Sequence, residues 1–186
     1  MVRMDKSQLG RAGELAIAFY GLVTSGGELE AFSPVVDDDH VDLVAGRRGS
    51  LPSIGIQVKT TDRLDANGLV QALASYPEGE LREDEAFLYA VLLLRSVEIR
   101  AVWVVPSPDF NRLAYQYVKA GRQVLEFRAS PDRQDAFAVF RIDPLQLGSA
   151  LLSRIDLAPA APPKWLRSLL QSADPGRKPA GGAGTR

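Results

Sequence analysis

The chain has 186 residues, 46% of them hydrophobic and 24% charged, and a formal net charge of −1. These values are typical of a globular protein built on one domain, and they lack the strong basic excess that many nucleic-acid-binding domains carry. The sequence contains no cysteine, which excludes disulfides, thiolate metal sites and cysteine nucleophiles. The longest apolar run, residues 86–94, is too short to cross a bilayer, and the first residues lack the apolar segment of a secretory signal. We therefore expect a cytoplasmic protein that makes no membrane contact.

The first predicted element is a helix over residues 7–23, where apolar residues recur at spacings of three and four. Ser7 is its expected N-cap, and the segment Ser25-Gly26-Gly27 is its expected end. Glu14 lies close to the small, apolar side of this helix. A first strand is expected over residues 28–36.

Two short strands are then expected at residues 41–44 and 54–60, joined by a turn-rich connector that allows them to pair as a hairpin. Because strand side chains alternate between faces, the second strand divides into two sets. One face carries Ile54, Ile56 and Val58, and the other carries Gln57 and Lys59. On the first strand, Val41 and Leu43 are expected to share a face, with Asp42 and Val44 on the opposite one.

This hairpin brings three polar side chains to one side of the predicted sheet. They are the carboxylate of Asp42, the amide of Gln57 and the ammonium of Lys59. A strand that carries a glutamine and a lysine beside an aspartate on the next strand is a candidate site, and this hairpin is the best one in the chain. A polar outer face on an edge strand is the alternative reading of Gln57 and Lys59.

The remaining pattern predicts further strands and helices in alternation. Residues 69–76 fit a short helix or an irregular strand, and residues 77–85 an acidic connector. Four strands and two helices in the rest of the sequence carry clearer signals. They are strands over 87–94, 99–105, 123–127 and 136–142, a helix from Ser107 or Asp109 to near Gly121, and a helix opened by Asp143-Pro144 and running through Ile155. This order predicts an α/β fold with a central mixed β-sheet flanked by helices.

The composition changes after residue 157. Residues 1–157 are expected to form the α/β domain. Residues 158–172 are expected to be a proline-rich linker with a short amphipathic segment, and residues 173–186 a disordered tail.

The arrangement of these residues resembles the PD-(D/E)XK nuclease superfamily, in which a helix acid precedes an aspartate on one strand and a D-x-K or E-x-K motif on the next. In this sequence Glu14, Asp42, Gln57 and Lys59 occupy those four places. The resemblance implies a restriction-endonuclease-like core and metal-dependent hydrolysis of phosphodiester bonds in DNA. The departure is Gln57, because most members carry a carboxylate there, and an amide lowers the negative charge of the site.

On this resemblance, Asp42, Gln57 and Glu14 are the metal ligands, and Mg²⁺ is the expected cofactor with Mn²⁺ as a substitute. Magnesium suits a site with one or two carboxylates, a carbonyl oxygen and several waters. Lys59 is expected to position the attacking water and to stabilise the charged transition state. Arg47 and Arg48, in the connector of the hairpin, are expected to contact the phosphate backbone.

Other readings of the same residues stay open. Asp39 is an alternative or supporting ligand, and His40, the single histidine, is a candidate general base. A homodimer is expected because duplex cleavage often uses a symmetric pair of sites. The main alternative function is a catalytically inactive nuclease-fold module that binds nucleic acid or a protein partner. A third reading is an unrelated α/β interaction protein in which Asp42 and Lys59 form a surface ion pair.

Overall fold

A computed structural model describes residues 4–34, 40–50, 53–96 and 98–158 of the chain. Its helices are α1 (Lys6–Thr24), α2 (Ser107–Leu113) and α3 (Leu147–Leu157), with 3-10 turns η1 (Ala138–Phe140) and η2 (Pro144–Gln146). Its strands are β1 (Leu29–Phe32), β2 (Leu43–Arg47), β3 (Ser53–Thr61), β4 (Val70–Pro77), β5 (Phe87–Arg95), β6 (Glu98–Pro106), β7 (Tyr115–Lys119), β8 (Arg122–Ala129) and β9 (Arg141–Ile142). The predicted tail and most of the predicted linker lie outside the described residues.

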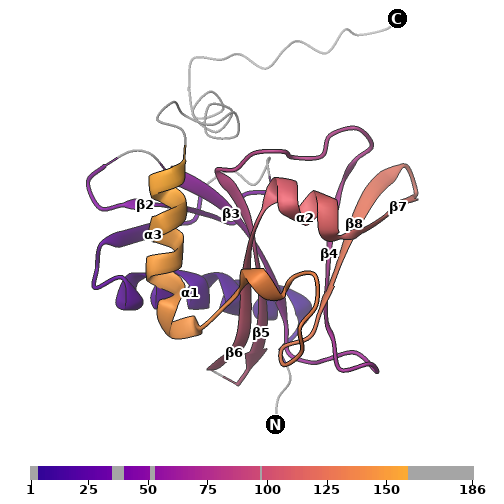
Figure 1. The fold of residues 1–186 in the computed structure, drawn as a ribbon, viewed down its shortest axis with the longest axis horizontal. Coiled ribbons are helices and arrows are strands. Elements are labelled where there is room, and N and C mark those ends of the chain that lie inside the picture. Colours follow the sequence, from indigo (N-terminus) through magenta and orange to yellow (C-terminus); the bar gives the residue numbers. More distant parts are fainter. Residues whose placement is uncertain (1–3, 35–39, 51–52, 97, 159–186) are drawn as a thin grey trace, which may run out of the picture.

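Two sheets form the body of the protein (Figure 1). The larger sheet has six strands in the order β1-β2-β3-β5-β6-β9, and the smaller has the order β4-β8-β7. Strands β3 and β5 pair in parallel, whereas the other pairs of the large sheet are antiparallel. The sequence-based prediction of a central mixed β-sheet flanked by helices is therefore confirmed.

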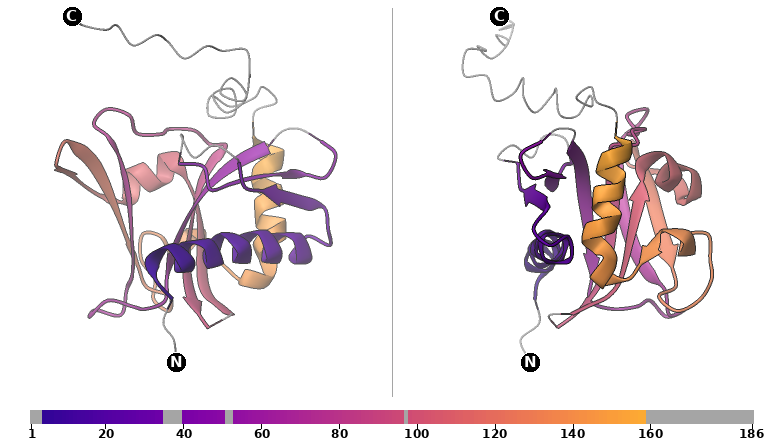
Figure 2. Two further views of the ribbon diagram at one scale, coloured as in Figure 1. Left: turned by 180° about the vertical axis from the view of Figure 1, so that it is seen from behind. Right: turned by 60° about the vertical axis from the view of Figure 1, so that its left-hand side comes forward.

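Helices α1 and α3 cover one face of the large sheet, and α2 and the small sheet cover the other (Figure 2). On the α1 side, Ile54, Ile56 and Val58 of β3 pack in one hydrophobic cluster with Ile17 of α1 and Leu151 of α3. This confirms the face assigned to the three β3 residues from their alternation. The opposite residues of β3 therefore point toward the small sheet.

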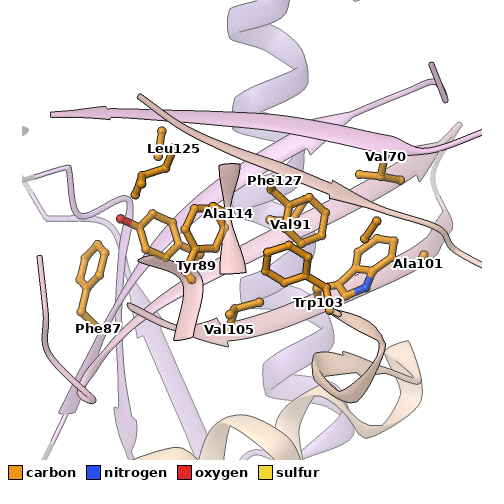
Figure 3. Packing of buried hydrophobic residues seen from close by; sticks show 14 of the residues in the cluster. Val70, Phe87, Tyr89, Val91, Ala101, Trp103, Val105, Ala114, Leu125 and Phe127 are labelled. Carbon is orange, nitrogen blue, oxygen red and sulfur yellow. The ribbon is translucent and has the colours of Figure 1, made fainter. Parts of the chain in front are cut away.

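The core between the two sheets is rich in aromatic side chains (Figure 3). Tyr89, Trp103 and Phe127 are fully buried there, and they come from β5, β6 and β8. The Tyr89 ring stacks on Phe110 of α2 with 3.9 Å between ring centroids, and Trp103 meets Phe127 edge to face at 5.4 Å. Offset stacked and edge-to-face pairs are the favourable aromatic arrangements, so this core fixes α2 and the small sheet against β5 and β6.

Close backbone approaches position α1. A Cβ atom added at Gly13 would overlap the Thr60 side chain of β3, whose Cβ would lie at 2.9 Å. At the other end of α1, a Cβ atom added at Gly148 of α3 would lie 2.6 Å from Gly21 O. The Gly148 N–H also donates to Thr24 Oγ1 at 2.7 Å. Asp5, rather than the predicted Ser7, is the N-cap of α1, because its carboxylate accepts from Gln8 N while the Gln8 side chain accepts from Asp5 N.

Two segments differ from the sequence-based prediction. The helix predicted to reach Gly121 ends at Leu113, where extended backbone at Ala114 leads directly into β7. Tyr117 and Val118 satisfy a helical spacing in the sequence, but pairing with β8 determines their structure. The strand predicted over residues 136–142 is mostly the turn η1, with only the two residues of β9 in the sheet.

A smaller correction concerns the start of the hairpin. Val41 and Leu43 do not share a face, because Val41 packs with Val44 in the cluster toward the small sheet and Leu43 packs toward α1. The alternation fails there because β2 begins only at Leu43. Residues 69–76, predicted as a short helix or irregular strand, are a regular strand, β4.

Candidate active site

The candidate site lies where the antiparallel pairing of β2 and β3 ends. Leu43 pairs with Ile56 in this ladder, and Asp42 N donates to Ile56 O at 2.9 Å. Beyond that bond the carboxylate of Asp42 takes over the pairing, because Val58 N donates to Asp42 Oδ2 at 2.6 Å. Asp42 is therefore held against β3 by its own N–H and by one carboxylate oxygen, on either side of Gln57 in the β3 sequence.

The Gln57 side chain is buried, with 4% of the residue exposed. The Tyr76 hydroxyl of β4 donates to Gln57 Oε1 at 3.0 Å and lies 2.6 Å from the Tyr89 hydroxyl of β5. Since the Tyr76 proton is given to Gln57, the Tyr89 hydroxyl must be the donor of the second bond. This chain of hydrogen bonds fixes the direction of the Gln57 amide.

The two tyrosines stay protonated over the whole physiological range. Burial raises the pKa of Tyr89, and the nearby Tyr76 raises it further. Burial is also the main cause of the raised pKa of Tyr76, although its hydrogen bond to Tyr89 opposes the increase. Both hydroxyls therefore keep the protons that orient Gln57.

Lys59 lies two residues after Gln57 on the same face of β3 and is partly buried. It lines a groove with a volume of ≈ 380 Å³ that is bordered by the start of α1, the end of β3 and β4. Because β3 has β2 and β5 on its two sides, it is not an edge strand. The alternative reading of Gln57 as part of a polar outer face is wrong, since the residue is buried against β4.

Glu14 lies on α1 beside Gly13, the residue that abuts Thr60 of β3. Its carboxylate accepts a hydrogen bond from Arg11 at 2.5 Å, and Arg11 also donates to Ser33 at 3.1 Å. The Glu14 side chain is 22% exposed. The structure thus places the predicted helix acid near the end of β3, but as the partner of an arginine.

The donor set is compatible with a hard divalent ion that keeps most of its own waters. Among the described residues, no group of three or more His, Asp or Glu side chains is arranged to hold a metal ion. The candidate ligands are the Asp42 carboxylate and the amide oxygen of Gln57. The Gln57 oxygen accepts one hydrogen bond from Tyr76 and has a second lone pair for a metal ion. Magnesium is often bound through only one or two carboxylates with several waters, so these residues fit it.

The two arginines predicted to contact phosphate lie at the other end of the hairpin. Arg47 ends β2, and at about 3.3 Å per residue a strand of this length separates it from Asp42 by roughly 15 Å. Arg47 pairs with Glu28 at 2.5 Å and with both oxygens of Asp156 at 3.0 Å. The Nε atom of Arg48 lies 3.6 Å from Oε1 of Glu30. Contact with phosphate stays a prediction for both, and it requires these ion pairs to open.

His40 lies next to the site in a strained conformation. Its φ of 54° is in the left-handed region, and its ring meets Tyr76 edge to face with 5.3 Å between centroids. The structure therefore connects His40 to the tyrosine that holds Gln57. Asp39, the alternative ligand, lies outside the described residues.

Sequence reasoning missed Tyr76 and Tyr89 as members of this site. Tyr89 lies within the apolar run that predicts a buried strand, and this pattern gives no reason to single out its hydroxyl. Tyr76 ends a segment whose type the sequence left open. A buried tyrosine hydroxyl needs a hydrogen-bond partner, and this requirement was the available signal.

The fold resembles that of a solved structure. That structure, described as a bacterial homing endonuclease, I-Ssp6803I, matches it with a TM-score of 0.58 over 83% of this chain and 96% of that chain, at 14% sequence identity. No protein-family model and no curated protein matches the sequence. Across the described residues, none of the helices combines the length and apolarity needed to cross a membrane.

Proposed function

We propose that the protein is a metal-dependent nuclease that hydrolyses phosphodiester bonds in DNA. The observation that carries this proposal is the end of the β2–β3 ladder. There Asp42 is fixed by Val58 N at 2.6 Å, Gln57 is oriented by Tyr76 at 3.0 Å, and Lys59 follows on the same face. The endonuclease-like fold supports the same function.

Asp42, the Gln57 amide oxygen and the backbone carbonyl of Val58 are the groups that would hold Mg²⁺ or Mn²⁺. Such an ion, when bound, polarises a phosphoryl oxygen and lowers the pKa of a coordinated water. The Lys59 ammonium orients the attacking water and offsets the negative charge that develops on the phosphate. Glu14 would orient the water or hold an ion from its place on α1. For this, its carboxylate must leave the ion pair with Arg11.

The second candidate function is an inactive module with the same fold that binds nucleic acid or a protein partner. Two observations favour it. Gln57 supplies a neutral amide instead of a carboxylate, and the described residues contain no cluster of three acidic or histidine ligands. The homodimer and the cytoplasmic location stay predictions from the sequence.

Cleavage of DNA tests the proposal. Linear, branched and single-stranded DNA would be incubated with Mg²⁺ or Mn²⁺ and the wild-type chain, Asp42→Asn or Lys59→Ala. Asp42→Asn keeps an oxygen that can accept the hydrogen bond from Val58 N, so it removes charge while preserving the ladder. Arg154→Ala, on α3, is the matched control. We expect metal-dependent cleavage by the wild type and the control, and a loss of at least about 100-fold in both site variants.

An absence of cleavage by the wild type with either metal, on all three DNA forms, would contradict the enzyme. Unchanged DNA binding by the two site variants would then support the inactive module.

A further inference from the structure

The groove beside Lys59 is built from three separate parts of the chain. It is lined by Lys6 from the first turn of α1, by Lys59 from the end of β3 with Arg63 and Asp65 from the turn that follows, and by Gln71 to Leu73 from β4. Its volume of ≈ 380 Å³ is an order of magnitude above the roughly 30 Å³ that one water occupies in the liquid. The groove therefore has room for a phosphate group with its adjoining sugars.

The lining carries an excess of positive charge. Lys6, Lys59 and Arg63 contribute three cations, and Asp65 contributes the single carboxylate among the lining residues. This local excess contrasts with the formal net charge of −1 for the whole chain. A concave surface with one sign of charge attracts ligands of the opposite sign, which here means a polyanion.

The Asp65 carboxylate is already used by its own turn. Its Oδ1 atom accepts from Asn67 N at 2.8 Å and from Leu69 N at 2.9 Å. These backbone hydrogen bonds, that of Leu69 first, lower the pKa of Asp65. The carboxylate thus stabilises the turn after Arg63, because its Oδ1 atom accepts hydrogen bonds from two backbone N–H groups of that turn.

Lys6 follows the N-cap Asp5 at the start of α1. It occupies the first turn of α1, where the helix dipole disfavours a positive side chain and favours an acidic one, and this turn contains no acidic residue. The Lys6 side chain is exposed at the mouth of the groove. Lys6 therefore adds an exposed positive charge to the edge of the groove.

We propose that this groove binds the phosphodiester backbone of DNA, with Lys6 and Arg63 contacting phosphates that flank the one presented to Lys59. The inference rests on the proposed function for its substrate and adds the binding path that leads to the site. It differs from the sequence-based expectation, which assigned phosphate contacts to Arg47 and Arg48 at the far end of the hairpin. Because the contacts are to phosphates, they carry affinity and no sequence preference.

The test measures DNA binding without catalysis. Fluorescence anisotropy with a labelled duplex in EDTA, at a series of salt concentrations, would compare the full wild-type chain with Lys6→Ala and Arg63→Ala. Arg154→Ala is the control for loss of an arginine outside the groove. We expect Lys6→Ala and Arg63→Ala each to weaken binding and to reduce the slope of log K against log salt concentration by about 0.9. Arg154→Ala should leave the slope unchanged.

Thermal denaturation of the same variants separates binding from folding. Lys6→Ala should not lower Tm, because it removes an unfavourable charge from the start of α1. Equal salt slopes for the wild type, Lys6→Ala and Arg63→Ala would contradict the proposal that the groove binds DNA. A wild type that does not bind DNA would contradict it as well. A wild type that binds through Lys6 and Arg63 but never cleaves with metal would contradict only the proposed enzyme. Cleavage with unaltered binding by both variants would contradict only the groove.

Discussion

At the scale of single residues, the site depends on how Gln57 is held. A glutamine amide can turn over and exchange its oxygen for its nitrogen, and only the oxygen can bind a cation. The Tyr76 hydroxyl removes this freedom because it donates to the oxygen, and Tyr89 donates to Tyr76 in turn. The strand pattern predicted where Gln57 points, but it did not predict what the side chain contacts.

Tyr76→Phe tests this arrangement. The substitution keeps the ring and removes the hydroxyl, so the buried Gln57 oxygen and the Tyr89 hydroxyl lose their partner. Leaving a buried polar group unpaired costs about 1–3 kcal/mol. We expect urea denaturation to show a loss of that size in the free energy of unfolding.

Tyr115→Phe is the matched control, because Tyr115 is 67% exposed and exposed substitutions usually change stability by less than about 0.5 kcal/mol. Equal effects of the two substitutions would show that the Tyr76 hydroxyl does not hold Gln57.

At the scale of elements, the approach of α1 to β3 places Glu14 and Lys6 beside the site. Gly13 makes this approach possible because a side chain there would overlap Thr60. The sequence predicted α1 and its glutamate from apolar spacing, since that signal lies within one helix. It could not predict the contact with Thr60, which joins residues far apart in the chain.

Paired glycine substitutions test the contact. Gly10, also in α1, has nothing within 4 Å of an added Cβ. Gly10→Ala should therefore stabilise the protein by about 0.5–1 kcal/mol through the helix propensity of alanine. Gly13→Ala should instead destabilise it by about 1–3 kcal/mol, because the added methyl overpacks the interface. Chemical denaturation of both variants measures the difference, and stabilisation by Gly13→Ala would contradict the close contact.

The elements also show why part of the fold escaped prediction. Strand β3 was predicted correctly because its apolar residues all face the hydrophobic cluster toward α1, whereas Gln57 on the other face meets Tyr76 of β4. Strand β7 was mistaken for helix because its spacing fits both structures and its partner β8 determines the outcome. Local pattern predicts an element well when the pattern itself fixes burial, and poorly when a pairing partner does.

At the scale of the whole molecule, the small sheet makes the site possible. Strand β4 brings Tyr76 over Gln57 and also forms one wall of the basic groove through Gln71 to Leu73. The hairpin alone would leave Gln57 facing solvent. The large sheet thus supplies the chemical groups, and the small sheet buries and orients them.

Thermal denaturation during a Mg²⁺ titration tests the central claim, that Asp42 and Gln57 hold a metal ion, most directly. At a hundredfold excess over Kd, a bound ion stabilises the native state by about 2.7 kcal/mol, which for a chain of this size raises Tm by roughly 5–10 °C. We expect a saturable rise for the wild type and none for Asp42→Asn. For Gln57→Glu, a rise at lower Mg²⁺ concentration is expected, because a second carboxylate joins the site. The same rise in Asp42→Asn as in the wild type would contradict the account, because the ion would then bind elsewhere.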